Sequence, residues 1–289
     1  MIGELFALMA ALSWAIGAIF DRVGLTKIPP LTANTMRSIP AAVFTLIITI
    51  LIEGLNPLTN VTFTDIIYII AGTTLALVIG DYFFLLSLRK LGVSKTMPIV
   101  SIYPIFALIG SALFLNESIT LFIGVGVAAT ITGVFFISRS RNVEQSDSNS
   151  KFLLIIPVIA ALMWGFSQVF FGLALLNTPP LTMTTIRLIY FSALLVTLNL
   201  TVGDRYFYRK YNSHWGRMST IGGFLSLALG GLFLILGLSY AGVAKTSPLT
   251  SVTPMFSTIL AVLLLKEKLE LNTCIGTALI IVGIILIIF

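Results

Sequence analysis

The sequence predicts an all-α integral membrane protein, with ten transmembrane helices that form two inverted five-helix repeats around a central cavity. Three observations lead to this fold class: the composition, an internal repeat and the placement of the basic residues. Of the 289 residues, 57% are hydrophobic and only 10% are charged, and the mean hydropathy is +1.06. A soluble domain of this length needs far more polar surface. A spanning helix needs about 20 mostly apolar residues, and such stretches follow one another along nearly the whole chain.

The chain contains an internal repeat. Residues 1–139 align with residues 151–289 at a constant offset of 150 without a gap, and 38 of the 139 aligned positions are identical. The matches that shared hydrophobicity cannot place in register include Trp14 with Trp164, Arg37 with Arg187, Lys95 with Lys245, and Pro104 with Pro254. Internal duplication of this kind is common in secondary transporters. We therefore predict a first repeat at 1–139, a cytoplasmic linker at 140–150 and an inverted second repeat at 151–289.

Five apolar stretches in each half define the predicted helices. In the first half they run roughly over 3–21, 32–52, 65–88, 96–115 and 119–138. In the second half they run roughly over 152–172, 182–202, 218–239, 246–265 and 270–289. The fourth and fifth stretches of each half are separated only by a short break, which holds Glu117 or Glu267. We expect both glutamates to cap the hairpin into the last helix of their own repeat.

The basic residues predict the orientation in the membrane. Because five is an odd number, the second repeat must enter the bilayer from the opposite side. In the ten-helix topology, 13 of the 17 Lys and Arg residues lie in the loops after helices 1, 3, 5, 7 and 9, all on one face. Short basic loops stay in the cytoplasm, so we predict a multi-pass protein of the plasma membrane whose two termini are both extracytoplasmic. The net charge of +6 is then an orientation signal rather than a nucleic-acid-binding patch.

The sequence lacks the signatures of a metal site, a cofactor site and an enzyme. One cysteine and one histidine offer no metal-ligand spacing, and no glycine-rich phosphate loop is present. There is also no HExxH, no Gly-x-Ser-x-Gly and no pair of intramembrane aspartates. We therefore expect no metal, no cofactor and no catalytic residue. Because no ATP-binding loop exists, transport would draw its energy from a gradient or from exchange.

One pattern occurs once in each half: a short loop, a helix with two prolines, and then a glutamate. It runs from Ser87 to Glu117 with Pro98 and Pro104, and from Gly237 to Glu267 with Pro248 and Pro254. This doubled pattern resembles the signature of the drug/metabolite transporter superfamily, EamA type, and the resemblance covers the whole chain. It implies a basket-like ten-helix transporter whose cavity is lined largely by helices 1, 3, 4, 6, 8 and 9. Members move amino acids, other small metabolites or toxic compounds, and relatives exchange nucleotide-sugars or sugar phosphates.

Helices 4 and 9 carry many hydroxyl groups. On helix 9, one face holds Thr246, Thr250, Thr253 and Ser257, and the adjacent row holds Ser247, Ser251 and Thr258. The first-half equivalents are Thr96, Ser101 and Tyr103. These residues either line a polar cavity or form hydrogen bonds between helices. The prolines of the same helices are gates in one interpretation and static kinks in the other.

Charged residues within or beside the spans are further candidates. Lys95 and Lys245 begin helices 4 and 9, where the helix dipole disfavours a cation, so they either attract an anionic substrate group or snorkel to lipid headgroups. Arg37 and Arg187 lie inside helices 2 and 7, which the resemblance places at the periphery, so we expect them to brace the structure, with a role in transport as the alternative. Asp81 lies about 10 Å from the nearer end of helix 3. It is a candidate for proton exchange or for binding a substrate amine, unless it forms a salt bridge or faces the cytoplasmic mouth.

Aromatic residues complete the predicted site. Trp14 and Trp164 lie too deep for an interfacial belt, so they either stack on a substrate as cavity walls or fill space between helices. The predicted substrate-binding set is Trp14, Asp81, Tyr82, Lys95, Ser101, Tyr103, Trp164, Lys245, Thr246, Thr250 and Thr253.

The sequence thus predicts a secondary transporter of small organic metabolites, amino acids or related solutes, that works by alternating access. Export is the commoner activity in the family that the chain resembles. One alternative is an exchanger of phosphorylated or nucleotide-linked sugars, favoured if the two lysines reach the cavity, and another is a lipid-linked flippase. The expected partners are the lipid bilayer, a small-molecule substrate, and a proton or counter-substrate for coupling. Both a monomer and a dimer fit the sequence.

Overall fold

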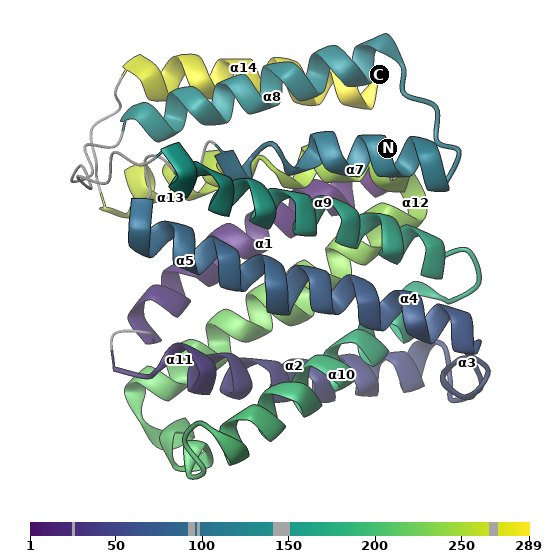
Figure 1. The fold of residues 1–289 in the computed structure, drawn as a ribbon, viewed down its shortest axis with the longest axis vertical. Coiled ribbons are helices and arrows are strands. Elements are labelled where there is room, and N and C mark those ends of the chain that lie inside the picture. Colours follow the sequence, from purple (N-terminus) through teal and green to yellow (C-terminus); the bar gives the residue numbers. More distant parts are fainter. Residues whose placement is uncertain (25–26, 92–95, 97–98, 141–150, 266–270) are drawn as a thin grey trace.

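The computed structural model describes residues 1–24, 27–91, 96, 99–140, 151–265 and 271–289. Within these residues all regular structure is helical (Figure 1). Seven of the described helical runs are long and apolar enough to cross a membrane, and two shorter apolar helices span Tyr103–Phe114 and Leu121–Ile137. The predicted all-helical membrane architecture is confirmed at this level.

The helices follow the predicted apolar stretches closely. The first half contains α1 (Ile2–Gly24), α2 (Pro30–Ile52), α3 (Asn56–Thr59), α4 (Phe63–Thr73), η1 (Thr74–Gly80), α5 (Asp81–Leu91), α7 (Tyr103–Phe114) and α8 (Leu121–Ser140). The second half contains η2 (Lys151–Leu154), α9 (Ile155–Ala174), α10 (Pro180–Thr201), η3 (Phe207–Asn212), α11 (His214–Gly223), η4 (Phe224–Gly230), α12 (Gly231–Thr250), α13 (Thr253–Leu265) and α14 (Leu271–Ile288). The short helices α3 and η3 were not predicted.

Irregular points in the helices recur at equivalent residues of the two halves. The π-helical segments η1 and η4 start 150 residues apart, and so do α7 and α13. Pro104 and Pro254 take the second position of α7 and α13, where a missing N–H is tolerated because first-turn donors have no helical acceptor. Two of the prolines that were predicted to interrupt helices therefore mark helix starts. Pro248 lies inside α12, and Pro98 lies outside the described residues.

The long helical run His214–Thr250 is divided at Gly242. Gly242 has φ +75° and ψ 175°, a conformation that only glycine adopts without strain. The carboxylate of Glu117 accepts hydrogen bonds from the backbone N–H groups of Val243 at 2.8 Å and Ala244 at 2.7 Å. Glu117 therefore caps the helical segment that begins after Gly242.

This cap corrects one expectation from the sequence. Glu117 was expected to cap the hairpin into the fifth helix of its own repeat, and that expectation is wrong because its carboxylate binds the backbone of the other half. The start of α8 is capped by Thr120, whose hydroxyl accepts from the N–H of Ile123 at 3.2 Å. Glu267 lies outside the described residues.

The equivalent helices α8 and α14 lie side by side at one end of the molecule (Figure 1). Glycines allow their backbones to approach closely. A Cβ atom added to Gly133 would lie 2.6 Å from the carbonyl oxygen of Gly276, and one added to Gly283 would lie 2.7 Å from that of Gly126. Because the residue numbers rise along one helix as they fall along the other, α8 and α14 are antiparallel.

The equivalent helices α2 and α10 pack together at the opposite end (Figure 1). The hydroxyls of Thr49 and Thr185 are hydrogen-bonded at 2.8 Å, and the hydroxyl of Thr32 donates to the Oδ1 atom of Asn199 at 3.2 Å. Both carboxylate oxygens of Glu53, at the end of α2, accept backbone N–H groups at the start of α10. These contacts also define an antiparallel pair.

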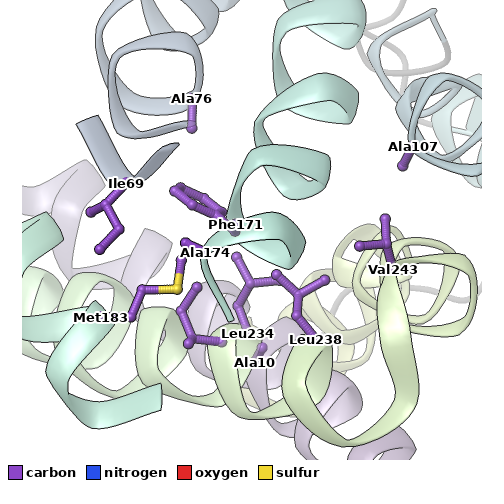
Figure 2. Packing of buried hydrophobic residues seen from close by; sticks show 11 residues of the cluster. Ala10, Ile69, Ala76, Ala107, Phe171, Ala174, Met183, Leu234, Leu238 and Val243 are labelled. Atoms are coloured by element: carbon purple, nitrogen blue, oxygen red, sulfur yellow. The ribbon is translucent and has the colours of Figure 1, made fainter. Parts of the chain in front are cut away.

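The largest apolar cluster joins residues from both halves, and Phe171 lies in its middle (Figure 2). Phe171 is fully buried, and its neighbours in the cluster include Ile69 and Met183. Three members of this cluster, Ala76, Phe171 and Leu234, also line the cavity described below. The apolar core therefore supports the cavity walls, because the two share these three residues.

Candidate functional site

A cavity of about 510 Å³ lies between the helices and has walls from both halves. The first half contributes residues of α1, η1, α5, α7 and α8, and the second half contributes residues of α9, η4, α12 and α13. Arg37 of α2 and Arg187 of α10 also reach the cavity. Of the 25 lining residues, 14 are apolar or aromatic and 11 are polar or charged. This size and composition are typical of a binding site for a small organic molecule.

Trp14 and Trp164, which are equivalent in the two repeats, both line the cavity. The indole N–H of Trp14 donates to the carbonyl oxygen of Ser226 at 3.0 Å, and that of Trp164 donates to the carbonyl oxygen of Ala76 at 3.2 Å. Both acceptors lie in the π-helical segments η4 and η1, a helix type that often occurs at functional sites. Each indole is therefore fixed by the backbone of the opposite half.

Two acidic residues of the first half, Asp81 and Asp21, lie at or near the cavity. Asp81 lines the cavity, and its Oδ1 atom accepts a second hydrogen bond from Trp164 Nε1 at 3.1 Å. Asp21 forms an ion pair with Arg37, with 2.9 Å between Oδ2 and Nη2, and both side chains are mostly buried. The same Nη2 donates to the hydroxyl of Ser226 at 2.7 Å, and the charge of Arg37 also attracts Asp81.

Arg187 also lines the cavity but has different surroundings. It is 3% exposed, and its guanidinium carbon lies 5.6 Å from the centre of the Phe171 ring. Its Nε atom has no hydrogen-bond partner within the described residues. The resemblance implies that helices 2 and 7 are peripheral, but both arginine side chains reach the cavity. Arg37 also joins α2 to α1 through its ion pair with Asp21, as expected of a bracing residue.

The hydroxyl-bearing residues lie partly in the cavity and partly between helices. The lining includes Ser101 and Tyr103 from the first half and Thr250, Ser251, Thr253 and Ser257 from the second. The hydroxyl of Tyr103 donates to the carbonyl oxygen of Ser247 at 3.0 Å and is hydrogen-bonded to Thr250 Oγ1 at 2.8 Å. Tyr103 thus ties the first half to the second beside the cavity.

Lys245 is engaged away from the cavity. Its Nζ atom lies 3.4 Å from a carboxylate oxygen of Glu4 and donates to the carbonyl oxygen of Ile288 at 3.2 Å. The side chain therefore joins α1 to the last turn of α14 rather than facing the cavity. Lys95, its repeat equivalent, lies outside the described residues.

Two other residues of the predicted set do not line the cavity. Tyr82 is 61% exposed on the outer surface of α5. Thr246 is fully buried, and its hydroxyl has no partner among the described residues. The structure thus brings together Trp14, Asp81, Ser101, Tyr103, Trp164, Thr250 and Thr253, and leaves Tyr82, Thr246 and Lys245 outside.

Some lining residues were missed by the sequence reasoning. Gln168 lines the cavity, is 5% exposed, and has an Oε1 atom without a partner in the described part of the chain. A lone amide inside an apolar span was a usable signal, but Phe84 and Phe171 gave none, because phenylalanine is common on every face of such helices. Within the described residues, no group of three or more His, Cys, Asp and Glu side chains could hold a metal ion.

Comparisons with known proteins agree with this architecture. An uncharacterized transporter from Archaeoglobus fulgidus is 24% identical over 294 residues, which cover 99% of this chain and 98% of the relative. A crystal structure of a protein with 14% sequence identity superposes with a TM-score of 0.81, over 98% of this chain and 95% of the other, which shows a shared fold. The EamA-like transporter family matches residues 1–139 and again residues 151–289. The chain therefore belongs to the EamA-like transporter family and is a membrane transporter.

Proposed function

We propose that the protein is a secondary transporter that exports small organic metabolites, amino acids or related solutes, by alternating access. The observation that carries this proposal is the cavity, because its walls come in equivalent pairs from the two halves. A site at the boundary between two halves opens to one side of the membrane and then to the other when the halves rock against each other.

The contacts between equivalent helices support ten spans in two inverted repeats. The pairs α2 with α10 and α8 with α14 are antiparallel, as inverted repeats require. The hydrogen bond from Trp14 to Ser226 has an equivalent in the bond from Trp164 to Ala76, with the halves exchanged. The division of the run His214–Thr250 at Gly242 separates the eighth and ninth predicted helices.

The position of the chain ends supports the proposed orientation. The N- and C-termini lie at the same side of the molecule (Figure 1). Together with the 13 basic residues that the ten-helix topology gathers on one face, this arrangement favours extracytoplasmic termini in the plasma membrane.

The cavity lining favours amino acids or related solutes over phosphorylated sugars. Aromatic walls suit a solute with an apolar body. The sugar-phosphate alternative depended on Lys95 and Lys245, and Lys245 is bound to Glu4 outside the cavity.

Counterflow in proteoliposomes tests the proposal. Vesicles preloaded with an unlabelled amino acid should take up the labelled one faster than empty vesicles, because a carrier exchanges solutes and a channel does not. Trp14→Ala should reduce this exchange, whereas Phe122→Ala, which removes a lipid-facing aromatic side chain of α8 (60% exposed), should not. Absence of counterflow for every amino acid, or faster exchange with a sugar phosphate, would reject the proposed substrate class.

Asp81→Asn tests proton coupling in the same vesicles. If Asp81 exchanges a proton, the wild-type exchange depends on pH and the variant loses that dependence. The asparagine can still accept from Trp164 through its carbonyl oxygen, so the wall is preserved. A pH profile that is identical in the two proteins would remove Asp81 as the proton site.

A further inference from the structure

The two matched arginines of the cavity stand in unequal electrostatic settings. Around Arg37, the ion-pair partner is Asp21, the hydroxyl of Ser226 accepts from Nη2, and the Oδ1 atom of Asn34 accepts from Nη1 at 3.2 Å. The carboxylate of Asp81 also interacts electrostatically with Arg37. Both terminal nitrogens of the Arg37 guanidinium are thus paired with groups of the protein, and its charge has an ion-pair partner, although its Nε atom has no partner among the described residues.

Around Arg187, the equivalent positions carry almost no hydrogen-bond acceptors. The residues that replace Asp21, Asp81, Ser226 and Asn34 at the offset of 150 are Phe171, Gly231, Ala76 and Thr184. The Nη2 atom of Arg187 lies so close to Gly231 that a Cβ atom there would be 2.1 Å from it. With the described residues, Arg187 makes no hydrogen bond and no ion pair. Its guanidinium carbon lies over the face of the Phe171 ring.

A buried guanidinium without an anion is unfavourable, because the charge has lost its water without gaining a partner. Arg187 lines the cavity, so a solute in the cavity can supply that partner. A carboxylate can fill this role, since its two oxygens match the two parallel N–H groups of the planar guanidinium.

Among the described residues, the same cavity lining also holds a free hydrogen-bond acceptor, the Oε1 atom of Gln168. Gln168 precedes Phe171 by one helical turn on α9, so the two side chains share a face, and Arg187 packs on that phenylalanine. The free Oε1 atom of Gln168 accepts a hydrogen bond from an N–H or O–H group. We propose that Arg187 binds the carboxylate of the transported solute and that Gln168 accepts from an amine or hydroxyl on the neighbouring carbon. This inference rests on the proposed function and specifies its substrate class as α-amino or α-hydroxy monocarboxylates with an apolar body.

Two matched series of probes test the inference. L-Leucine and L-phenylalanine are each compared with the corresponding amide, the decarboxylated amine and the deaminated acid, by thermal shift of the purified protein and by counterflow. The amino acids and the deaminated acids should bind, and the amides and amines should bind at least about tenfold more weakly, since one charge-assisted hydrogen bond is worth about a factor of ten or more.

Variants locate the effect at the guanidinium. Arg187→Gln should remove the preference for carboxylates, and Arg187→Lys should keep part of it, because lysine retains the charge without the planar pair of donors. Lys27→Gln removes one exposed positive charge outside the cavity and should leave the preference unchanged. If Arg187→Gln does not fold, the preference for carboxylates is still tested by the probe series on the wild-type protein and by its partial loss in Arg187→Lys.

The possible outcomes separate this inference from the proposed function. Equal binding of the acids and the amides, binding of no carboxylate, or a carboxylate preference that survives in Arg187→Gln would each overturn the role of Arg187. Counterflow of amines or amides alone would leave a transporter with a different site. Absence of counterflow for every probe would overturn the proposed function for this solute class.

Discussion

Replacing Gly230 by alanine tests whether the cavity wall at Trp14 is held by the backbone of the other half. A Cβ atom at Gly230 would lie 2.6 Å from both Cδ1 and Nε1 of Trp14, well inside van der Waals contact. The indole must therefore move, and its hydrogen bond to the carbonyl oxygen of Ser226 at 3.0 Å is stretched or lost. Overpacking of this kind costs about 1–3 kcal/mol, and the lost hydrogen bond costs about 1 kcal/mol more.

The gain in helix propensity offsets about 1 kcal/mol of this loss, so Gly230→Ala should be destabilised by about 1–3 kcal/mol. Gly80→Ala is the repeat equivalent and should behave alike, because its Cβ atom would lie 2.6 Å from Cδ1 of Trp164. Gly124→Ala is the matched control: the site is exposed on α8, and a Cβ atom there meets nothing within 4 Å. Its stability should be unchanged or slightly higher.

The assay is unfolding of the purified protein in mixed micelles, followed by tryptophan fluorescence, together with counterflow in proteoliposomes. Both tight-site variants should unfold earlier and exchange solute more slowly than the Gly124→Ala control. If Gly230→Ala matched that control in unfolding, in emission spectrum and in exchange, the close packing of the indole would not be what shapes the cavity wall.

Two other contacts and the proposed topology give further predictions. Glu117→Ala should lower the free energy of unfolding by about 2–4 kcal/mol, because two charge-assisted hydrogen bonds are lost, and Glu117→Gln by less; equal stability in the micelle assay would contradict the cap. Arg37→Gln should cost about 3–5 kcal/mol because Asp21 is left buried and unpaired, and adding Asp21→Asn should recover part of that loss in the same assay. In a background without the native cysteine, Lys27→Cys and Lys210→Cys should be labelled by an impermeant maleimide only from the cytoplasmic side; labelling from opposite sides would contradict the topology.

The helices were predictable because their cause is local. Each span must satisfy its own backbone hydrogen bonds in lipid, so a run of apolar residues is enough to place it, as at Pro180–Thr201. The equivalence of the halves was predictable for a different reason, since residues such as Trp14 and Trp164 keep one register over 139 positions. Both the spans and the repeat can therefore be read from the order of residues alone.

The placement of polar side chains was not predictable in the same way. Lys245 and Arg187 are both basic residues in register with an equivalent, yet one is tied to Glu4 at the end of the bundle and the other lines the cavity. The difference depends on which helices pack together, and a repeat pattern carries no such information. Glu117 shows the same limit, because its partners lie 126 and 127 residues away in the other half.

The residues around the cavity fall into two groups: those that hold its walls in place, which we call the frame, and those that carry charge. The residues that hold the frame are matched, since Trp14 and Trp164 make exchanged hydrogen bonds to η4 and η1. In the alternating access that we propose, a frame built in this way is expected to give two conformations of similar energy. The residues that carry charge around the arginines are unmatched: Asp21 and Asp81 occur in the first half alone. A solute with one acidic end therefore meets one paired and one unpaired guanidinium, and it binds in a single orientation in a cavity whose walls are otherwise nearly symmetric.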